Sequence, residues 1–131
     1  MTNLPSSESE FKSKAGIKRI LTALCYSWQG LRQAWKSEHA FRQELFLCGP
    51  GILIALCLPV QLLEKILLII VCILVLVVEL INSAIEAVVD RISLECHPLS
   101  KNAKDFGSAA VMLTVLMASL VWITILFQHF F

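Results

Sequence analysis

Polar residues recur along one segment of the chain, ELINSAIEAVVDR (residues 79–91), at a spacing that suits a helix. They are separated by steps of three, four and four residues and comprise Glu79, Asn82, Glu86 and Asp90. At about 100° per residue, these side chains fall on one stripe of a helix. Aligned carboxylates repel one another unless a cation, a proton or a basic side chain lies among them. The stripe is therefore a candidate site for chemistry that depends on charge.

Glu79 is the most informative residue of the stripe because it directly follows an uncharged apolar run, residues 66–78. A carboxylate inside a membrane-spanning segment is expensive to bury and indicates a function by default. Asp90 is less specific. It stands next to Arg91 and equally fits a helix end that faces lipid headgroups.

Three further charged residues can join the stripe from other segments. Glu38 lies near the end of a predicted amphipathic helix, at the edge of its apolar face, although a surface charge beside Lys36 fits the same position. Lys104 and Asp105 precede an apolar run. Taken alone, Asp105 reads as a charge at a helix N-terminus and Lys104 as a side chain that reaches toward the headgroups.

Carboxylates with a few lysines and arginines suit metal-assisted phosphoryl transfer. Mg²⁺ prefers one or two carboxylates together with phosphate oxygens, and a carboxylate not bound to metal can take a proton from a hydroxyl. The sequence has no glycine-rich phosphate loop, so a nucleotide site would differ from that of soluble kinases. The same pattern permits a proton- or cation-coupled transporter that uses Glu79. The residues alone leave both functions open.

The composition predicts the elements that position these residues. Of 131 residues, 57% are hydrophobic and 16% are charged, far from the balance of a soluble domain. Uncharged runs at 45–63, 66–78 and 106–131 predict three membrane-spanning helices, over about 45–63, 66–91 and 105–128, with a loop at 92–104. This leaves no room for a separate soluble catalytic domain. The net charge of +1 argues against nucleic acid as a partner. We therefore expect an all-α membrane protein.

The segment before the first span divides into two parts. Residues 1–14 are polar and predict a flexible tail. Residues 15–43 predict an amphipathic helix that lies on the membrane surface, because its apolar residues, Trp28 and Trp35 among them, share one face. Residues 15–131 would then form one membrane domain.

Charged residues also predict the orientation. Seven of the eleven lysines and arginines precede the first span, and three lie between spans two and three. Because positive residues stay in the cytoplasm, we expect the N-terminus and the loop at 92–104 there. The five cysteines are odd in number and form no CxxC motif, so we interpret them as small buried apolar residues.

Three ordered motifs resemble the small prokaryotic diacylglycerol kinases, which are integral membrane enzymes. They are YSWQGLRQAWKSEHAFRQE (residues 26–44), ELINSAIEAVVDR (residues 79–91) and AKDFGSAAV (residues 103–111). The resemblance covers roughly residues 16–127. It implies a homotrimer of helical protomers in the bacterial inner membrane, with sites shared between subunits. It also implies transfer of the γ-phosphoryl group of MgATP to the hydroxyl of diacylglycerol, giving phosphatidate.

The resemblance further implies a role for each matching residue. Glu79 would be the general base, and Asn82 would orient the site with Asp90. Glu38 and Glu86 would hold the divalent cation. The nucleotide contacts would be Arg19, Tyr26, Glu38, Glu86, Asp90, Glu95, His97, Lys104 and Asp105. The lipid contacts would be Ser27, Trp28, Arg32, Trp35, Glu79 and Ser108.

Related undecaprenol kinases are the main alternative, because they share this scaffold and the sequence His97-Pro98-Leu99 is similar to theirs. The segments ELINS (residues 79–83) and GSAAV (residues 107–111) resemble the diacylglycerol enzymes more closely, which favours diacylglycerol. A small proton-coupled transporter would explain Glu79, but not the charges that continue toward the cytoplasm. A membrane adaptor without catalytic activity would explain only the hydropathy.

Overall fold

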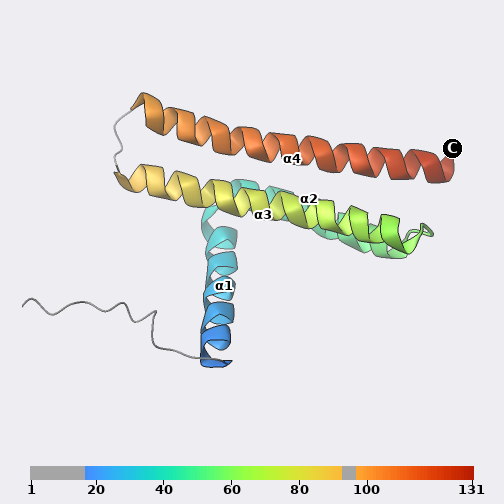
Figure 1. Ribbon diagram of the computed structural model, residues 1–131, viewed down its shortest axis with the longest axis horizontal. Helices are drawn as coiled ribbons and strands as arrows, with labels where there is room; N and C mark the ends of the chain where they lie inside the picture. Colours follow the sequence, from blue (N-terminus) through green and yellow to red (C-terminus); the bar gives the residue numbers. More distant parts are fainter. Residues whose placement is uncertain (1–16, 93–96) are drawn as a thin grey trace, which may run out of the picture. The chain divides into compact units, whose positions relative to one another are not determined.

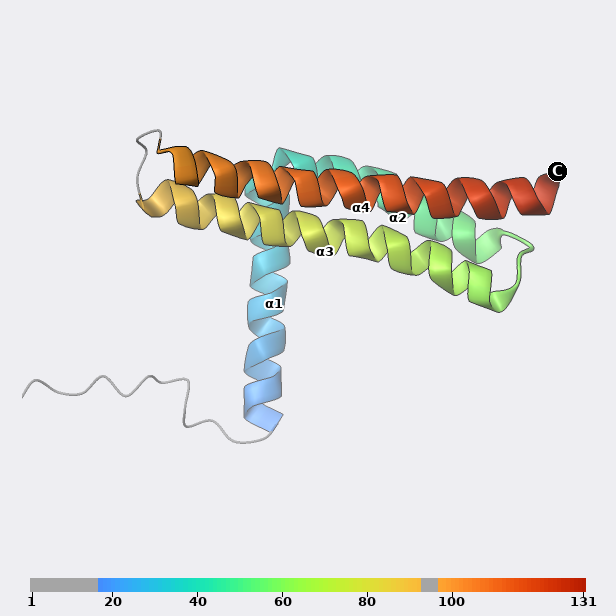
Figure 2. The ribbon, with the colours of Figure 1, turned by 45° about the horizontal axis from the view of Figure 1, so that its top comes forward.

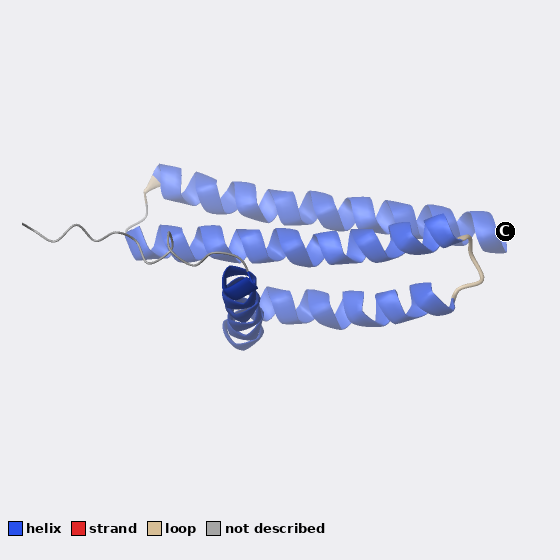
Figure 3. Ribbon diagram, turned by 60° about the horizontal axis from the view of Figure 1, so that its bottom comes forward, coloured by secondary structure: helices blue, strands red, loops and turns tan. Residues whose placement is uncertain are grey.

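The computed structural model describes residues 17–92 and 97–131 of the chain. This part is helical and contains α1 (Ile17–Ser37), α2 (His39–Cys57), α3 (Leu62–Ile92) and α4 (Pro98–Phe130). Figure 3 shows helices and no strand in the part that is described. The tail expected over residues 1–14 lies outside the described residues.

The helices divide between two compact units, one ending at Gln33 and the other running from Ala34 to Phe131. In the second unit, α3 packs against both α2 and α4. Figures 1 and 2 show that each neighbour runs antiparallel to α3, as short connections between helices require. The second unit thus holds the three predicted spans.

Three helices are long and apolar enough to cross a membrane, namely α2, α3 and α4. At 1.5 Å per residue, the 19 residues of α2 extend about 28 Å, close to the hydrocarbon thickness of about 30 Å. The 31 residues of α3 extend about 46 Å, so α3 is longer than the hydrocarbon is thick. The prediction of an all-helical fold is confirmed for the described residues, and three of the helices could span a membrane.

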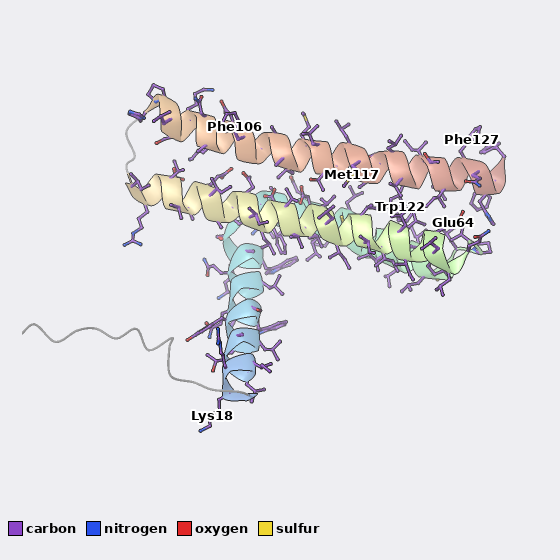
Figure 4. The ribbon with its side chains drawn as sticks, in the orientation of Figure 1. Lys18, Glu64, Phe106, Met117, Trp122 and Phe127 are labelled. Atoms are coloured by element: carbon purple, nitrogen blue, oxygen red, sulfur yellow. The ribbon has the colours of Figure 1, made fainter. Side chains whose placement is uncertain are left out.

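Two apolar clusters hold the three helices together. The larger contains Cys48, Val71, Cys72, Val75 and Ala118, and the smaller contains Ala55, Leu68 and Ile125. Trp122 of α4, labelled in Figure 4, packs against both clusters. Large apolar side chains elsewhere, such as Phe106 and Phe127, are exposed in a single chain, as expected where lipid or another protein replaces water.

The cysteines differ from the expectation that all of them are buried. Cys48 and Cys72 are buried, whereas Cys25 and Cys57 are exposed, and all of these are free thiols. Exposure of Cys57 has a physical reason, because an apolar side chain on a spanning helix is stable when it faces lipid. Cys96 lies outside the described residues.

Helix α4 begins at Pro98, within the segment expected to be a loop up to residue 104. Proline suits the first turn of a helix, because the N–H that it lacks would have no helical partner there. The imidazole of His97 caps this end, since its Nδ1 accepts a hydrogen bond from the backbone N–H of Leu99 at 3.2 Å. The proline therefore starts α4 early, and Lys104 lies on a helix.

The connection between α2 and α3 is also earlier than expected. Helix α2 ends at Cys57 because Leu58 precedes Pro59 and takes an extended conformation, with φ −62° and ψ 138°. Helix α3 then begins at Leu62, so Lys65 belongs to its first turns. Lys65 Nζ donates to the carbonyl oxygen of Leu56 at 2.8 Å, which satisfies one of the last carbonyls of α2.

The predicted surface helix differs at its C-terminal end. Instead of continuing to residue 43, α1 ends at Ser37 and α2 begins at His39. Glu38 alone separates them and is extended, with φ −97° and ψ 112°. Helix α2 then continues through Pro50. The sequence has neither glycine nor proline at Glu38 to indicate a break. The prediction relied on hydrophobic periodicity, which did not reveal that the helix ends there.

Gly107 determines how closely α4 approaches α3. It is buried against Asn82, and a Cβ atom placed on Gly107 would overlap Asn82 Oδ1 and lie 3.1 Å from Asn82 Cγ. Several small residues lie near the start of α4, and of these Gly107 is buried and Ala103 is half-buried. The others, Ser108, Ala109 and Ala110, are exposed. The close approach of α4 to α3 therefore occurs at Gly107.

We predict that Gly107→Ala destabilises the protein by about 1–3 kcal/mol, because the new methyl group must displace α4 or the Asn82 amide. The free energy of unfolding can be measured by titration of detergent-solubilised protein with SDS. Gly51→Ala is the matched control, since its Cβ would meet only ordinary contacts, at 3.6 Å from Cys72 Sγ and 3.7 Å from Trp122. Equal stability of the two variants would contradict the prediction.

Candidate functional site

The buried face of α3 changes from apolar to polar along its length. Its buried residues are Leu68, Val71, Cys72, Val75, Glu79 and Asn82, at steps that keep them on one side of the helix. Glu79 is only 3% exposed and Asn82 is 8% exposed. The polar stripe seen in the sequence is thus a continuation of the stripe that forms the core.

Exposure rises along the stripe after Asn82. Glu86 is half-buried, and the side chain of Asp90 is 53% exposed. The four residues therefore form a gradient from the packed interior of the helices to solvent. Such a gradient suits a site at the boundary between apolar and polar surroundings.

Asn82 links two parts of the site through its side-chain amide. Its Nδ2 donates to Glu86 Oε1 at 3.0 Å, which orients that carboxylate. Its Oδ1 is buried and accepts no hydrogen bond from the described residues. A buried oxygen without a donor is unusual, because burial without a hydrogen bond costs about 1–3 kcal/mol. Asn82 Oδ1 is therefore a buried acceptor without a donor among the described residues.

Two carboxylates from different parts of the second unit interact electrostatically with Glu79. One is Glu86, about two turns further along α3, and the other is Glu38 at the break between α1 and α2. Ser37 Oγ donates to Glu38 Oε1 at 2.9 Å. The structure therefore brings together three carboxylates that the sequence proposed for one site.

Glu44 is a fourth carboxylate at this site, and the sequence analysis missed it. Along the antiparallel α2 and α3, Ala55 packs in the cluster of Leu68 and Cys48 in the cluster of Val75. The same register places Glu44 opposite Glu79.

The electrostatics agree with this register, because the Glu44 and Glu79 carboxylates repel one another. Glu44 Oε2 is buried and has no hydrogen-bond partner among the described residues. The sequence contained a signal, since Glu44 and Glu79 each border an uncharged run at the same end of antiparallel helices.

Lys104 and Asp105 lie beyond the carboxylates, where α3 and α4 leave the apolar core. Lys104 Nζ lies 2.6 Å from Asp90 Oδ1 and joins the two helices, while Lys101 Nζ lies 2.5 Å from Asp105 Oδ2 on α4 itself. Both ion pairs are solvent-accessible, so each stabilises the fold by less than about 1 kcal/mol.

Three further residues of the C-terminal half were predicted to belong to the site, namely Glu95, His97 and Ser108. His97 caps α4, and Ser108 is exposed on the same helix. Glu95, expected to contact nucleotide, lies outside the described residues.

Five predicted contacts belong to the unit that ends at Gln33, and this unit is described by itself. They are Arg19, Tyr26, Ser27, Trp28 and Arg32, all exposed on α1. Ser27 Oγ donates to the carbonyl oxygen of Ala23 at 3.0 Å. Trp35 belongs to the second unit, and its ring centroid lies 5.8 Å from that of Phe46. The roles of these residues rest on the resemblance of their sequence motif.

The donor atoms of the site suit a hard cation. Glu38 and Glu86 offer carboxylate oxygens, and Asn82 holds Glu86. No group of three or more His, Cys, Asp or Glu side chains within residues 17–92 and 97–131 is arranged to hold a metal ion. Mg²⁺ needs no such group, because it is commonly bound by one or two carboxylates with waters and substrate phosphates. The residues present fit that mode of binding.

Comparison with known proteins identifies the group to which this sequence belongs. The profile described as prokaryotic diacylglycerol kinase matches residues 25–126. The chain is 52% identical over 120 residues to the diacylglycerol kinase of Pseudomonas aeruginosa, covering 92% of this chain and 98% of that protein.

Two other relatives are similar to the chain over nearly the same region. A diacylglycerol kinase of Escherichia coli K12 is 50% identical over 115 residues, covering 88% of this chain and 94% of that protein. A Helicobacter pylori diacylglycerol kinase is 47% identical over 117 residues, covering 88% and 91% respectively. Matches of this extent show that the chain belongs to the prokaryotic diacylglycerol kinase family.

Proposed function

We propose that this protein transfers the γ-phosphoryl group of ATP to the hydroxyl of diacylglycerol, which gives phosphatidate and ADP. The observation that carries the proposal is Glu79, a buried carboxylate in a membrane-spanning helix with other carboxylates grouped around it. Relatives of 52% and 50% identity over most of the chain are named diacylglycerol kinases, which supports the same substrate here.

Glu79 is the proposed general base. A lipid hydroxyl remains near the membrane boundary, and Glu79 lies on α3 where the apolar face gives way to polar side chains. A carboxylate there can accept the hydroxyl proton as the oxygen attacks phosphorus, since a base must lie within hydrogen-bond reach of the proton. Asn82 is proposed to orient the site, because it already holds the neighbouring Glu86.

Glu38 and Glu86 are the proposed ligands of Mg²⁺. When bound, a divalent cation would neutralise charge on the ATP phosphates. Without a cation, the carboxylates of Glu38 and Glu86 repel that of Glu79. A bound cation would reduce this repulsion. Lys104 and Asp105, with Asp90, are proposed to contact the nucleotide beyond the apolar region.

The exposure gradient along α3 supports separate routes for the two substrates. Glu79 is packed among apolar helices, whereas Asp90 and Lys104 are accessible to solvent. We therefore place diacylglycerol on the membrane side and ATP on the aqueous side. Trp28 and Trp35, both exposed, are proposed to line the lipid side from α1 lying on the membrane surface.

The proposed location is the bacterial inner membrane, with the N-terminus and the connection before α4 in the cytoplasm. Seven of the eleven lysines and arginines precede residue 45, and three more, Arg91, Lys101 and Lys104, lie where α3 ends and α4 begins. ATP is supplied from the side on which positive residues stay. A homotrimer with sites shared between subunits is proposed on the resemblance. The large exposed apolar side chains of α2, α3 and α4 are compatible with helix packing between protomers.

The proposed reaction can be tested with purified protein in mixed micelles, Mg²⁺ and γ-labelled ATP, with diacylglycerol and undecaprenol offered separately. We expect label in phosphatidate. Label only in the polyprenol product would reassign the substrate, and label in neither product would contradict the kinase assignment.

We predict that Glu79→Gln lowers turnover by about 10²-fold or more, because a neutral amide cannot accept the hydroxyl proton. ATP affinity, measured by equilibrium binding, is expected to remain near normal. Glu64→Gln is the control, since Glu64 accepts a hydrogen bond from the N–H of Gln61 at the opposite end of α3. Near-normal turnover in Glu79→Gln would remove the general-base assignment.

We predict that Glu38→Gln and Glu86→Gln each raise the Mg²⁺ concentration for half-maximal activity by about tenfold or more, as expected when a carboxylate ligand is lost. The measurement is a Mg²⁺ titration at fixed ATP, again with Glu64→Gln for comparison. An unchanged titration in both variants would exclude the two residues as metal ligands.

A further inference from the structure

The break between α1 and α2 requires a stabilising interaction. The local sequence, WKSEHAFR (residues 35–42), contains neither glycine nor proline, yet Glu38 leaves the helical conformation. Its backbone N–H still donates to Ala34 O at 2.9 Å. The carbonyls that follow Ala34 lose their partners, because the chain no longer continues as one helix.

Arg42 satisfies these carbonyls from the first turn of α2. Its Nη1 donates to Trp35 O at 2.8 Å and to Lys36 O at 3.1 Å. Its Nη2 lies 2.8 Å from His39 Nδ1, which must accept, because a guanidinium group can only donate. One side chain therefore connects the end of α1 to the start of α2.

The guanidinium group is well suited to this position for two reasons. Its planar arrangement of N–H groups reaches two carbonyl oxygens and an imidazole at once, which a lysine ammonium does not do in one plane. Its positive charge also lies at the C-terminal end of α1, where the helix dipole favours a cation. Both effects favour the break over a continuous helix.

We propose that Arg42 is a positioning residue that holds Glu38 at the site by fixing this break. Glu38 is the single residue between the carbonyls that Arg42 binds and the helix that carries Arg42. The Glu38 carboxylate interacts electrostatically with Glu79, so the conformation at residue 38 determines where this carboxylate lies. The inference rests on the proposed function insofar as Glu38 binds the cation.

The experiment compares Arg42→Gln, Glu38→Gln and the double variant with the unmodified protein. Lys65→Gln is the matched control, because Lys65 also donates to a carbonyl at the end of a helix, Leu56 O, but at the opposite end of α2. Two quantities are measured: the Mg²⁺ concentration for half-maximal activity, and hydrogen exchange of the backbone amides of residues 36–42 without ATP or Mg²⁺.

We expect Arg42→Gln to accelerate exchange at residues 36–42 and to raise the half-activating Mg²⁺ concentration about tenfold, as a lost supporting hydrogen bond does. In the Glu38→Gln background, the same substitution should add less than about twofold, because both act through one carboxylate. Lys65→Gln should change neither quantity. Arg42→Lys, expected to show the same changes at smaller amplitude, replaces Arg42→Gln should that variant not fold.

The outcomes separate the two proposals. Unchanged exchange at residues 36–42, or effects of Arg42→Gln and Glu38→Gln that multiply independently, would overturn the role of Arg42. An unchanged Mg²⁺ titration in Glu38→Gln would instead remove Glu38 as a ligand. In that case the exchange measurement still decides whether Arg42 fixes the break.

Discussion

The cost of burying a carboxylate among apolar helices is the constraint on which this structure depends. Glu79 is almost fully enclosed in the single chain, and an unpaired buried charge costs several kcal/mol. The surroundings change along α3, from apolar contacts before Glu79 to the buried amide of Asn82 and then to solvent-accessible charges. The cost of holding a charge therefore falls toward the solvent-accessible end of the helix. The proposed chemistry explains why such a residue is retained, since a base for a lipid hydroxyl must lie at the depth of that hydroxyl.

The close contact of α3 with α4 keeps the site enclosed. Gly107 contributes no side chain, and the space this leaves is occupied by the Asn82 amide. The amide in turn holds Glu86, so a glycine on one helix influences the position of a carboxylate on another. Packing and chemistry are therefore coupled here, and the same contact that stabilises the helix pair orients a proposed metal ligand.

The sequence by itself determined which residues carry charge in an apolar chain and which helix face they share. The spacing of Glu79, Asn82, Glu86 and Asp90 predicted one stripe, because helical periodicity depends only on local geometry. The uncharged runs predicted three spans, because hydrocarbon thickness sets the length of a spanning helix. The family motifs came from the same residues and agree with the relatives found by comparison.

Only the tertiary structure decided what faces that stripe. Glu44 lies opposite Glu79 through the register of two antiparallel helices, and no local period carries that information. The break at Glu38 depends on a side chain four residues further on, without a glycine or proline to mark it. Pro98 reads as a loop residue in isolation and becomes the first turn of α4 when His97 caps it. In each case the structure depends on an interaction between two particular groups. The pattern of residue types along the chain does not specify which groups will pair.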